Sequence, residues 1–294
     1  MKFQLKIWLQ KNKKIKFKGI ICTFKYENHN INKMSQDTKE LKLAVLIDAD
    51  NVPYSNVKGM MEEIAKFGTP TTKRIYADWT KPNAGGWKSV LLEHAITPIQ
   101  QYSYTIGKNS SDSAMIIDAM DLLYSDKVDG FCIVSSDSDF TRLAIRLRES
   151  GMKVIGIGEQ KTPNSFIVAC DRFIYIEVLD GAIKKKAKKR TSDTKKPVGK
   201  PIEKPVEKSL NKIDSDTIEL IETSIEDICD DDGWAFLGDV GNLIVKRKPE
   251  FDPRNYGFSK LTPMLKSLTD ILEIDERDSD KKGIKHVYVR LRFS

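Results

Sequence analysis

The most constraining feature of the sequence is a regular alternation of short apolar runs with amphipathic stretches over residues 41–180. The first run, residues 43–47, is apolar at every position, as expected for a strand buried on both faces of a parallel sheet. The next stretch, residues 55–67, places its apolar residues at helical spacing. Because this order repeats along the segment, the sequence predicts an α/β domain with a mostly parallel central sheet and helices on both of its faces.

The remaining elements of this segment follow from the same two periodicities. We expect strands at residues 72–79, 97–102, 131–135, 153–157 and 173–177, and helices at residues 86–94, 112–124, 140–150 and 163–170. Glycines such as Gly68 and Gly151 follow predicted helices and indicate where these helices end.

A second pattern begins at residue 214. It predicts helices at residues 217–229, 237–247 and 258–268, a short strand at residues 234–237, and two further strands at residues 271–276 and 286–292 around a polar turn. Three helices followed by a terminal hairpin are typical of a small winged-helix-like α+β domain.

The net charge of +7 is unevenly distributed. Residues 1–40 form a basic tail for which we expect no packed structure, and residues 181–213 are a Lys/Pro-rich linker that has too few apolar residues to build a core. The predicted domains, residues 41–180 and 214–294, each carry more acidic than basic residues. Basic tails on acidic domains indicate a polyanionic partner, with solvated linkers as the alternative.

Several classes of protein are excluded by composition. The four cysteines lie far apart without a C-x-x-C pair, so neither a zinc site nor a disulfide framework is predicted. No apolar run approaches the roughly 20 residues of a membrane helix, and the basic start lacks the apolar segment of a secretory signal. We therefore expect a cytoplasmic protein without a membrane partner.

Carboxylates gather where predicted strands end. Asp48 and Asp50 follow the first strand, Asp137 and Asp139 follow the fourth, and Asp112 lies where a helix begins. In an open parallel sheet the carboxyl ends of the strands line the functional crevice. Carboxylates brought together there repel one another unless a cation neutralises them, and oxygen ligands favour Mg²⁺ or Mn²⁺. The alternative is that these side chains only cap turns and helices.

Three motifs in order make the first domain recognisable: L-x-V-L-I-D-A-D-N at residues 43–51, G-K-N-S-S-D-S-A-M-I-I-D at residues 107–118, and V-S-S-D-S-D-F at residues 134–140. Together they resemble the NYN domain, in the LabA-like branch of the PIN-like nuclease superfamily. Residues 214–294, with G-W-A at 233–235 and N-Y-G-F-S-K-L at 255–261, look like an OST-HTH/LOTUS domain.

The resemblance implies a PIN-like three-layer fold for the first domain and the activity of a metal-dependent ribonuclease. Asp48, Asp112, Asp137 and Asp139 would bind Mg²⁺ or Mn²⁺, and Asn51, which matches the family's first motif, would orient a ligand or a phosphate.

Two positions complicate this resemblance. Asp118 matches a recurrent family position, but it lies six residues beyond Asp112 and therefore points away from it on a helix. Ser136 replaces a glycine often found before the aspartate of the last motif, which narrows access for a phosphate.

The candidate RNA contacts are polar side chains in the last two motifs and on or near the third helix of the second domain. They are Lys108, Ser135, Ser136, Arg254, Tyr256 and Lys260. The alternatives are solvated charges for the lysines and turn-shaping hydroxyls for the serines. Because the second domain is acidic overall, its partner is either RNA held by local contacts or a protein.

Three functions remain open at this stage. The leading hypothesis is a Mg²⁺- or Mn²⁺-dependent endoribonuclease that acts on single-stranded or structured RNA, with the second domain and the basic linker holding the RNA. The second is an RNA-binding regulator with weak or no catalysis. The third is a phosphatase of the haloacid dehalogenase type, suggested by Asp48-x-Asp50 after an apolar strand but lacking that family's other motifs.

Overall fold

The computed structural model describes residues 40–80, 86–102, 110–179, 213–278 and 285–292. Within these ranges, no helix is long and apolar enough to cross a membrane. Almost all of the predicted basic tail, residues 1–40, and of the predicted linker, residues 181–213, lies outside the described residues. Lys108 also lies outside them.

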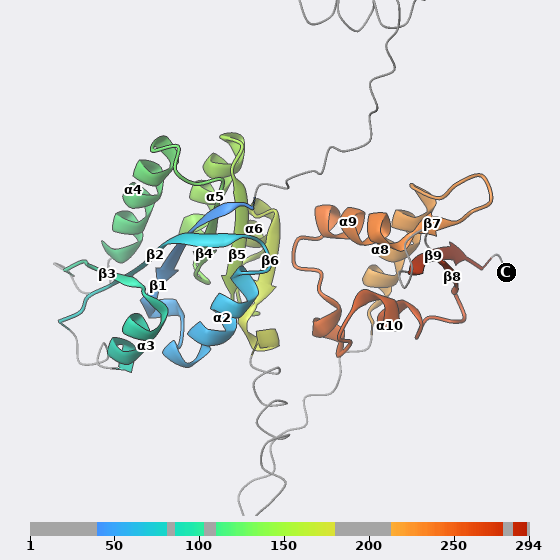
Figure 1. The fold of residues 1–294 in the computed structure, drawn as a ribbon, viewed down its shortest axis with the longest axis horizontal. Coiled ribbons are helices and arrows are strands. Elements are labelled where there is room, and N and C mark those ends of the chain that lie inside the picture. Colours follow the sequence, from blue (N-terminus) through green and yellow to red (C-terminus); the bar gives the residue numbers. More distant parts are fainter. Residues whose placement is uncertain (1–39, 81–85, 103–109, 180–212, 279–284, 293–294) are drawn as a thin grey trace, which may run out of the picture. The chain divides into compact units, whose positions relative to one another are not determined.

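A six-stranded sheet forms the centre of the first domain (Figure 1). Its strands are β1 (Lys42–Asp48), β2 (Thr69–Ala77), β3 (Thr97–Gln100), β4 (Gly130–Val134), β5 (Lys153–Gly158) and β6 (Arg172–Tyr175). They lie in the order β3-β2-β1-β4-β5-β6, and every neighbouring pair is parallel. The α/β fold is thus confirmed, with a sheet that is parallel throughout rather than mostly so.

Helices cover both faces of this sheet (Figure 1). They are α2 (Val57–Ile64), α3 (Trp87–His94), α4 (Ser110–Tyr124), α5 (Thr141–Glu149) and α6 (Asn164–Ala169). One buried cluster joins α4, α5 and α6 to the sheet through residues such as Met115, Leu143 and Phe166. A second cluster joins α2 and α3 to the opposite face through residues such as Met60 and Trp87. The fully apolar strands are therefore explained by burial on both sides.

The register of the central strands places the predicted aspartates at one edge. On β1, Ile47 pairs with Val134 of β4, and Asp48 pairs with Tyr76 of β2. Since all the strands run in the same direction, Asp48 and the residues that follow Val134 emerge at the carboxyl edge of adjacent strands. Alternation along β1 sends Ala44 and Leu46 to the face covered by α4, so Asp48 also points to that face.

The second domain has its own three-stranded antiparallel sheet in the order β7-β9-β8. Its elements are α8 (Ser215–Glu226), β7 (Ala235–Phe236), α9 (Leu237–Arg247), α10 (Leu261–Leu265), β8 (Leu272–Asp278) and β9 (Lys285–Leu291). A separate buried cluster, including Ile221, Val240 and Val289, holds the helices against this sheet. The small α+β domain predicted from the sequence is confirmed.

One predicted helix is shorter than its apolar pattern indicates. The sequence predicts a helix over residues 258–268, but the structure has a 3-10 turn at Pro253–Tyr256 and a helix only at Leu261–Leu265. Gly257 adopts a left-handed conformation with φ of 84°, and Lys260 is extended with φ of −151°. These two backbone conformations separate the turn from the helix, which a hydrophobic period does not reveal.

Candidate metal centre

Three aspartates meet at the carboxyl edge of the sheet. Asp112 comes from the first turn of α4, and Asp137 and Asp139 come from the turn after β4. One carboxylate oxygen from each lies within 4.8 Å of the other two. Asp112 is buried, Asp137 is partly buried and Asp139 is exposed, so the cluster opens to solvent on one side.

A tight turn after β4 brings two of these carboxylates together. Asp137 precedes the 3-10 turn Ser138–Phe140, and its Oδ1 accepts a hydrogen bond of 3.0 Å from the backbone N–H of Asp139. The capping role that we considered as an alternative is thus real for Asp137. Asp137 can cap the turn and belong to the cluster at the same time, because the capping hydrogen bond fixes the directions of the Asp137 and Asp139 side chains.

Asp48 forms the same kind of turn after β1 but is buried, with 2% of its surface exposed. Its Oδ1 accepts from the N–H of Asp50 at 3.2 Å, and its Oδ2 accepts from the Nδ2 of Asn51 and from the Oγ of Ser135. Burial raises the pKa of Asp48, and the hydrogen bonds from Asn51 and Ser135 oppose this shift. Asp48 is not among the three clustered aspartates, and Asn51 contacts Asp48 directly.

Ser135 connects the two strand ends. Its hydroxyl donates to Asp48 at 2.9 Å and accepts from the N–H of Asp137 at 3.1 Å. The next residue, Ser136, accepts from the N–H of Glu159 at 2.9 Å. Both serines are buried, so their hydroxyls hold the end of β4 to its neighbours. Their predicted contact with RNA stays a prediction.

The geometry of the cluster fits a divalent cation. Mg²⁺ binds oxygen ligands at about 2.1 Å, so two ligands on opposite sides of the ion lie about 4.2 Å apart. The carboxylate oxygens of the three aspartates lie within 4.8 Å of one another, which is only slightly more than this separation. Three carboxylates at this spacing repel one another, and a cation between them relieves that repulsion. The chemistry of this donor set matches Mg²⁺ or Mn²⁺.

Asp118 does not join the three clustered aspartates, as the helical spacing predicts. Arg74 and Tyr76 of β2 both donate hydrogen bonds to its carboxylate. Burial, together with the neighbouring Asp118 carboxylate, raises the pKa of Tyr76, so its hydroxyl stays protonated and donates. The sequence motif identified Asp118 but gave no signal for its partners, which lie more than 40 positions earlier in the chain.

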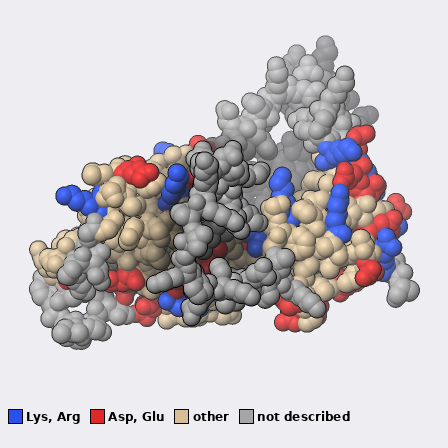
Figure 2. Space-filling view, turned by 90° about the horizontal axis from the view of Figure 1, so that it is seen from below, with Lys and Arg blue, Asp and Glu red and all other residues tan. Residues whose placement is uncertain are grey.

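In the second domain, two of the three predicted RNA contacts are engaged internally. Arg254 donates from its guanidinium to both oxygens of Asp252, and the hydroxyl of Tyr256 lies 2.8 Å from Oγ1 of the buried Thr217. Lys260 is exposed. On the face drawn in Figure 2, acidic and basic side chains of the described residues are interspersed.

The sheet of the second domain carries a group of stacked side chains that sequence analysis missed. The guanidinium of Arg290 lies 4.6 Å from the ring centre of Trp234, and that of Arg277 lies 4.2 Å from the ring centre of Tyr288. These side chains come together through the register of β8 and β9, in which Asp275 pairs with Tyr288. The G-W-A motif at residues 233–235 contains Trp234, and the alternation of polar and apolar residues indicates which side chains share a face, but neither signal shows which side chains stack.

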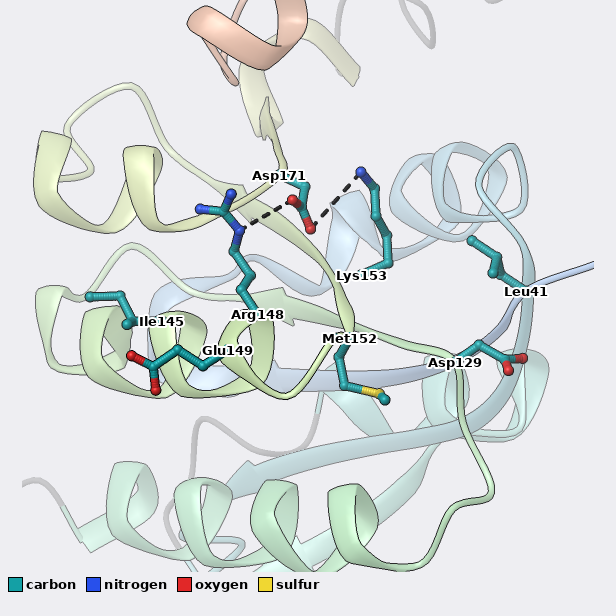
Figure 3. A pocket seen from close by; sticks show the side chains of 9 residues that line it. Leu41, Asp129, Ile145, Arg148, Glu149, Met152, Lys153 and Asp171 are labelled. Carbon is teal, nitrogen blue, oxygen red and sulfur yellow. Dashed lines mark hydrogen bonds and ion pairs between the residues drawn. The ribbon is translucent and has the colours of Figure 1, made fainter. Parts of the chain in front are cut away.

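A surface hollow lies at the opposite edge of the first domain (Figure 3). It is lined at the amino ends of the strands by residues including Asp129, Arg148, Lys153 and Asp171. Asp171 pairs with Arg148 at 3.1 Å and with Lys153 at 3.9 Å, so both cations already have a carboxylate partner. This hollow is separate from the three aspartates, which lie at the carboxyl edge.

Binding of Mn²⁺ should stabilise the protein against heat through these aspartates. At a Mn²⁺ concentration about 100 times the Kd, binding to the folded state alone contributes about 2.7 kcal/mol, which raises Tm by several degrees. Differential scanning calorimetry with and without Mn²⁺ measures the shift. The Asp112→Asn variant should lose most of it, and an equal shift in both proteins would contradict the site.

Comparison with known proteins agrees with the motifs. The model of the NYN domain family matches residues 42–177, and the model of the OST-HTH/LOTUS domain matches residues 208–284. No curated protein matches the chain.

Two solved structures are similar to parts of the chain. A protein of unknown function from Vibrio parahaemolyticus is 22% identical with a TM-score of 0.40, covering 48% of this chain and 96% of that one. An uncharacterized protein from Nitrosomonas europaea is 31% identical with a TM-score of 0.26, and the match covers 35% of this chain and 93% of that one.

Proposed function

Because the chain contains an NYN domain followed by an OST-HTH/LOTUS domain, we propose that it is a metal-dependent ribonuclease that hydrolyses phosphodiester bonds in RNA. The observation that carries this proposal is the meeting of Asp112, Asp137 and Asp139 at the carboxyl edge of the sheet. These residues would hold Mg²⁺ or Mn²⁺. When bound, such a cation lowers the pKa of coordinated water and stabilises negative charge on the phosphoryl oxygens.

The protein's own residues prepare this site. The turn after β4 fixes Asp137 and Asp139, and α4 brings Asp112 to them. Ser135 ties Asp137 to Asp48, so the ends of β1 and β4 are held together as one rigid edge. Asp48 accepts hydrogen bonds from Asn51 and Ser135 and so orients the Ser135 hydroxyl. Carboxylates held in place in this way need little rearrangement during the reaction.

The second domain would hold the RNA. This part of the proposal rests on its family and on the exposed Lys260 together with the Arg and aromatic side chains of its sheet. Guanidinium groups and aromatic rings are the side chains on which unpaired bases stack. The basic residues between the two domains add attraction to the phosphate backbone that does not depend on sequence.

The test is cleavage of end-labelled RNA by the purified full chain. We expect fragments of single-stranded RNA in the presence of Mn²⁺, and loss of cleavage when EDTA removes the metal. Reappearance of cleavage on adding excess Mn²⁺ controls for damage by the chelator. Cleavage that continues in EDTA would contradict the proposal, because the carboxylates would then have no cation to hold.

A regulator that binds RNA without cutting it is the second candidate. The observation that favours it is the burial of Asp48, whose two oxygens already accept hydrogen bonds from within the protein. RNA retained in a gel-shift assay but left intact in Mn²⁺ would support this candidate and overturn the first.

A further inference from the structure

A partly buried polar network ties α4 to the sheet. Arg74 and Tyr76 are two residues apart on β2 and therefore point to the same face, where Asp118 of α4 accepts a hydrogen bond from each. Arg74 binds Oδ1 and Tyr76 binds Oδ2, so both carboxylate oxygens are used. We call these three residues the helix clamp.

The helix clamp is mostly shielded from water. The side chain of Asp118 is 19% exposed and that of Arg74 is 32% exposed, while Tyr76 is fully buried in the same core cluster as Met115 and Ala119 of α4. An ion pair in this environment is costly to break from one side, because the remaining charge loses its partner. The position of α4 is therefore restrained by polar geometry as well as by apolar packing.

The helix clamp lies close to the candidate metal centre along two elements. Asp118 follows Asp112 by six residues, which is about 9 Å along a helix that rises about 1.5 Å per residue. Tyr76 pairs in register with Asp48 on the adjacent strand. One end of the clamp thus sits on the helix that supplies Asp112, and the other sits beside the strand that carries Asp48.

We infer that the helix clamp sets the position of α4 along and around its axis, and so holds Asp112 at the distance from Asp137 and Asp139 that a divalent cation requires. Asp118 is then a positioning residue that acts through Asp112 and does not touch the metal. The inference rests on the proposed function only in taking the three aspartates as a cation site. It requires no RNA cleavage.

The experiment measures Mn²⁺ affinity of the full chain by isothermal titration calorimetry, well below the unfolding temperature. Asp118→Asn keeps the size of the side chain but removes the charge that pairs with Arg74. We expect its Kd for Mn²⁺ to rise about 10- to 100-fold, as is usual when a residue that orients a metal ligand is lost. The matched control is Asp121→Asn, an exposed aspartate on the same helix, which should change the Kd less than twofold.

Further variants separate positioning from folding. Tyr76→Phe removes one hydrogen bond and should raise the Kd about two- to tenfold even if Asp118→Asn fails to fold. Asp118→Glu should recover part of the affinity because it restores the charge. If Asp118→Asn lowers Tm but binds Mn²⁺ like the wild type, or if Tyr76→Phe leaves the Kd unchanged, the clamp is only structural and the inference is overturned.

The two proposals fail in different ways. If the wild type binds Mn²⁺ and cleaves no RNA, the ribonuclease proposal falls while the Kd values of the variants still decide the clamp. A wild type that binds no Mn²⁺ would overturn both.

Discussion

Replacing Asp137 with asparagine should reduce Mn²⁺-dependent RNA cleavage at least about a hundredfold. Loss of a residue that merely orients a metal ligand typically costs 10- to 100-fold, so loss of a ligand should reach the upper end of that range or exceed it. The asparagine variant tests one of the two roles of Asp137, because it removes the negative charge and keeps a side-chain oxygen. The carboxylate of Asp137 belongs to the cluster, and its Oδ1 fixes the turn that carries Asp139.

The measurement is the initial rate of cleavage of labelled RNA at saturating Mn²⁺. An asparagine at position 137 keeps an oxygen that can accept from the Asp139 N–H, so the turn should survive and Tm should change little. Asp121→Asn is again the matched control, since it removes a charge from the same domain at an exposed position. An Asp137→Asn protein that cleaves at the wild-type rate would rule out the proposed site.

Replacing Phe140 with alanine should destabilise the first domain by about 3–5 kcal/mol, the usual cost of removing a buried aromatic side chain. Phe140 is fully buried directly after Asp139, and its ring centre lies 6.5 Å from that of Phe166. The side chain therefore anchors the turn of the candidate metal centre in the core shared by α5 and α6. Mn²⁺ affinity should fall as well, because the turn loses its anchor.

Urea unfolding followed by circular dichroism tests this expectation. The two domains have separate cores, so only the transition of the first domain should move to lower urea. Leu92→Ala is the control, because Leu92 is 79% exposed and its truncation should change stability by less than about 0.5 kcal/mol. A loss below about 1 kcal/mol for Phe140→Ala would show that the turn is held by other contacts.

The sequence alone predicted the order and type of the elements in both domains. Fully apolar runs such as residues 43–47 are unfavourable at a surface exposed to water, so they predicted strands that are buried on both faces of a parallel sheet. The same reasoning placed the aspartates after β1 and β4 at one edge, because parallel strands end on the same side. Motifs spread over the chain indicated the two domain families, and the matches to residues 42–177 and 208–284 confirm both.

The structure alone decided which acidic groups meet. Asp48 and Asp137 lie at the ends of adjacent strands, and each caps a 3-10 turn of the same kind. Asp137 joins Asp112 and Asp139, whereas Asp48 accepts hydrogen bonds from Asn51 and Ser135. Tyr256 and Asp118 likewise have partners, Thr217 and Arg74, that lie far away in the sequence and that no motif indicates. A periodic pattern determines which side of a strand or helix is buried. The partner of a polar side chain depends on strand register, helix placement and turn geometry together, and these are fixed only when the whole domain packs.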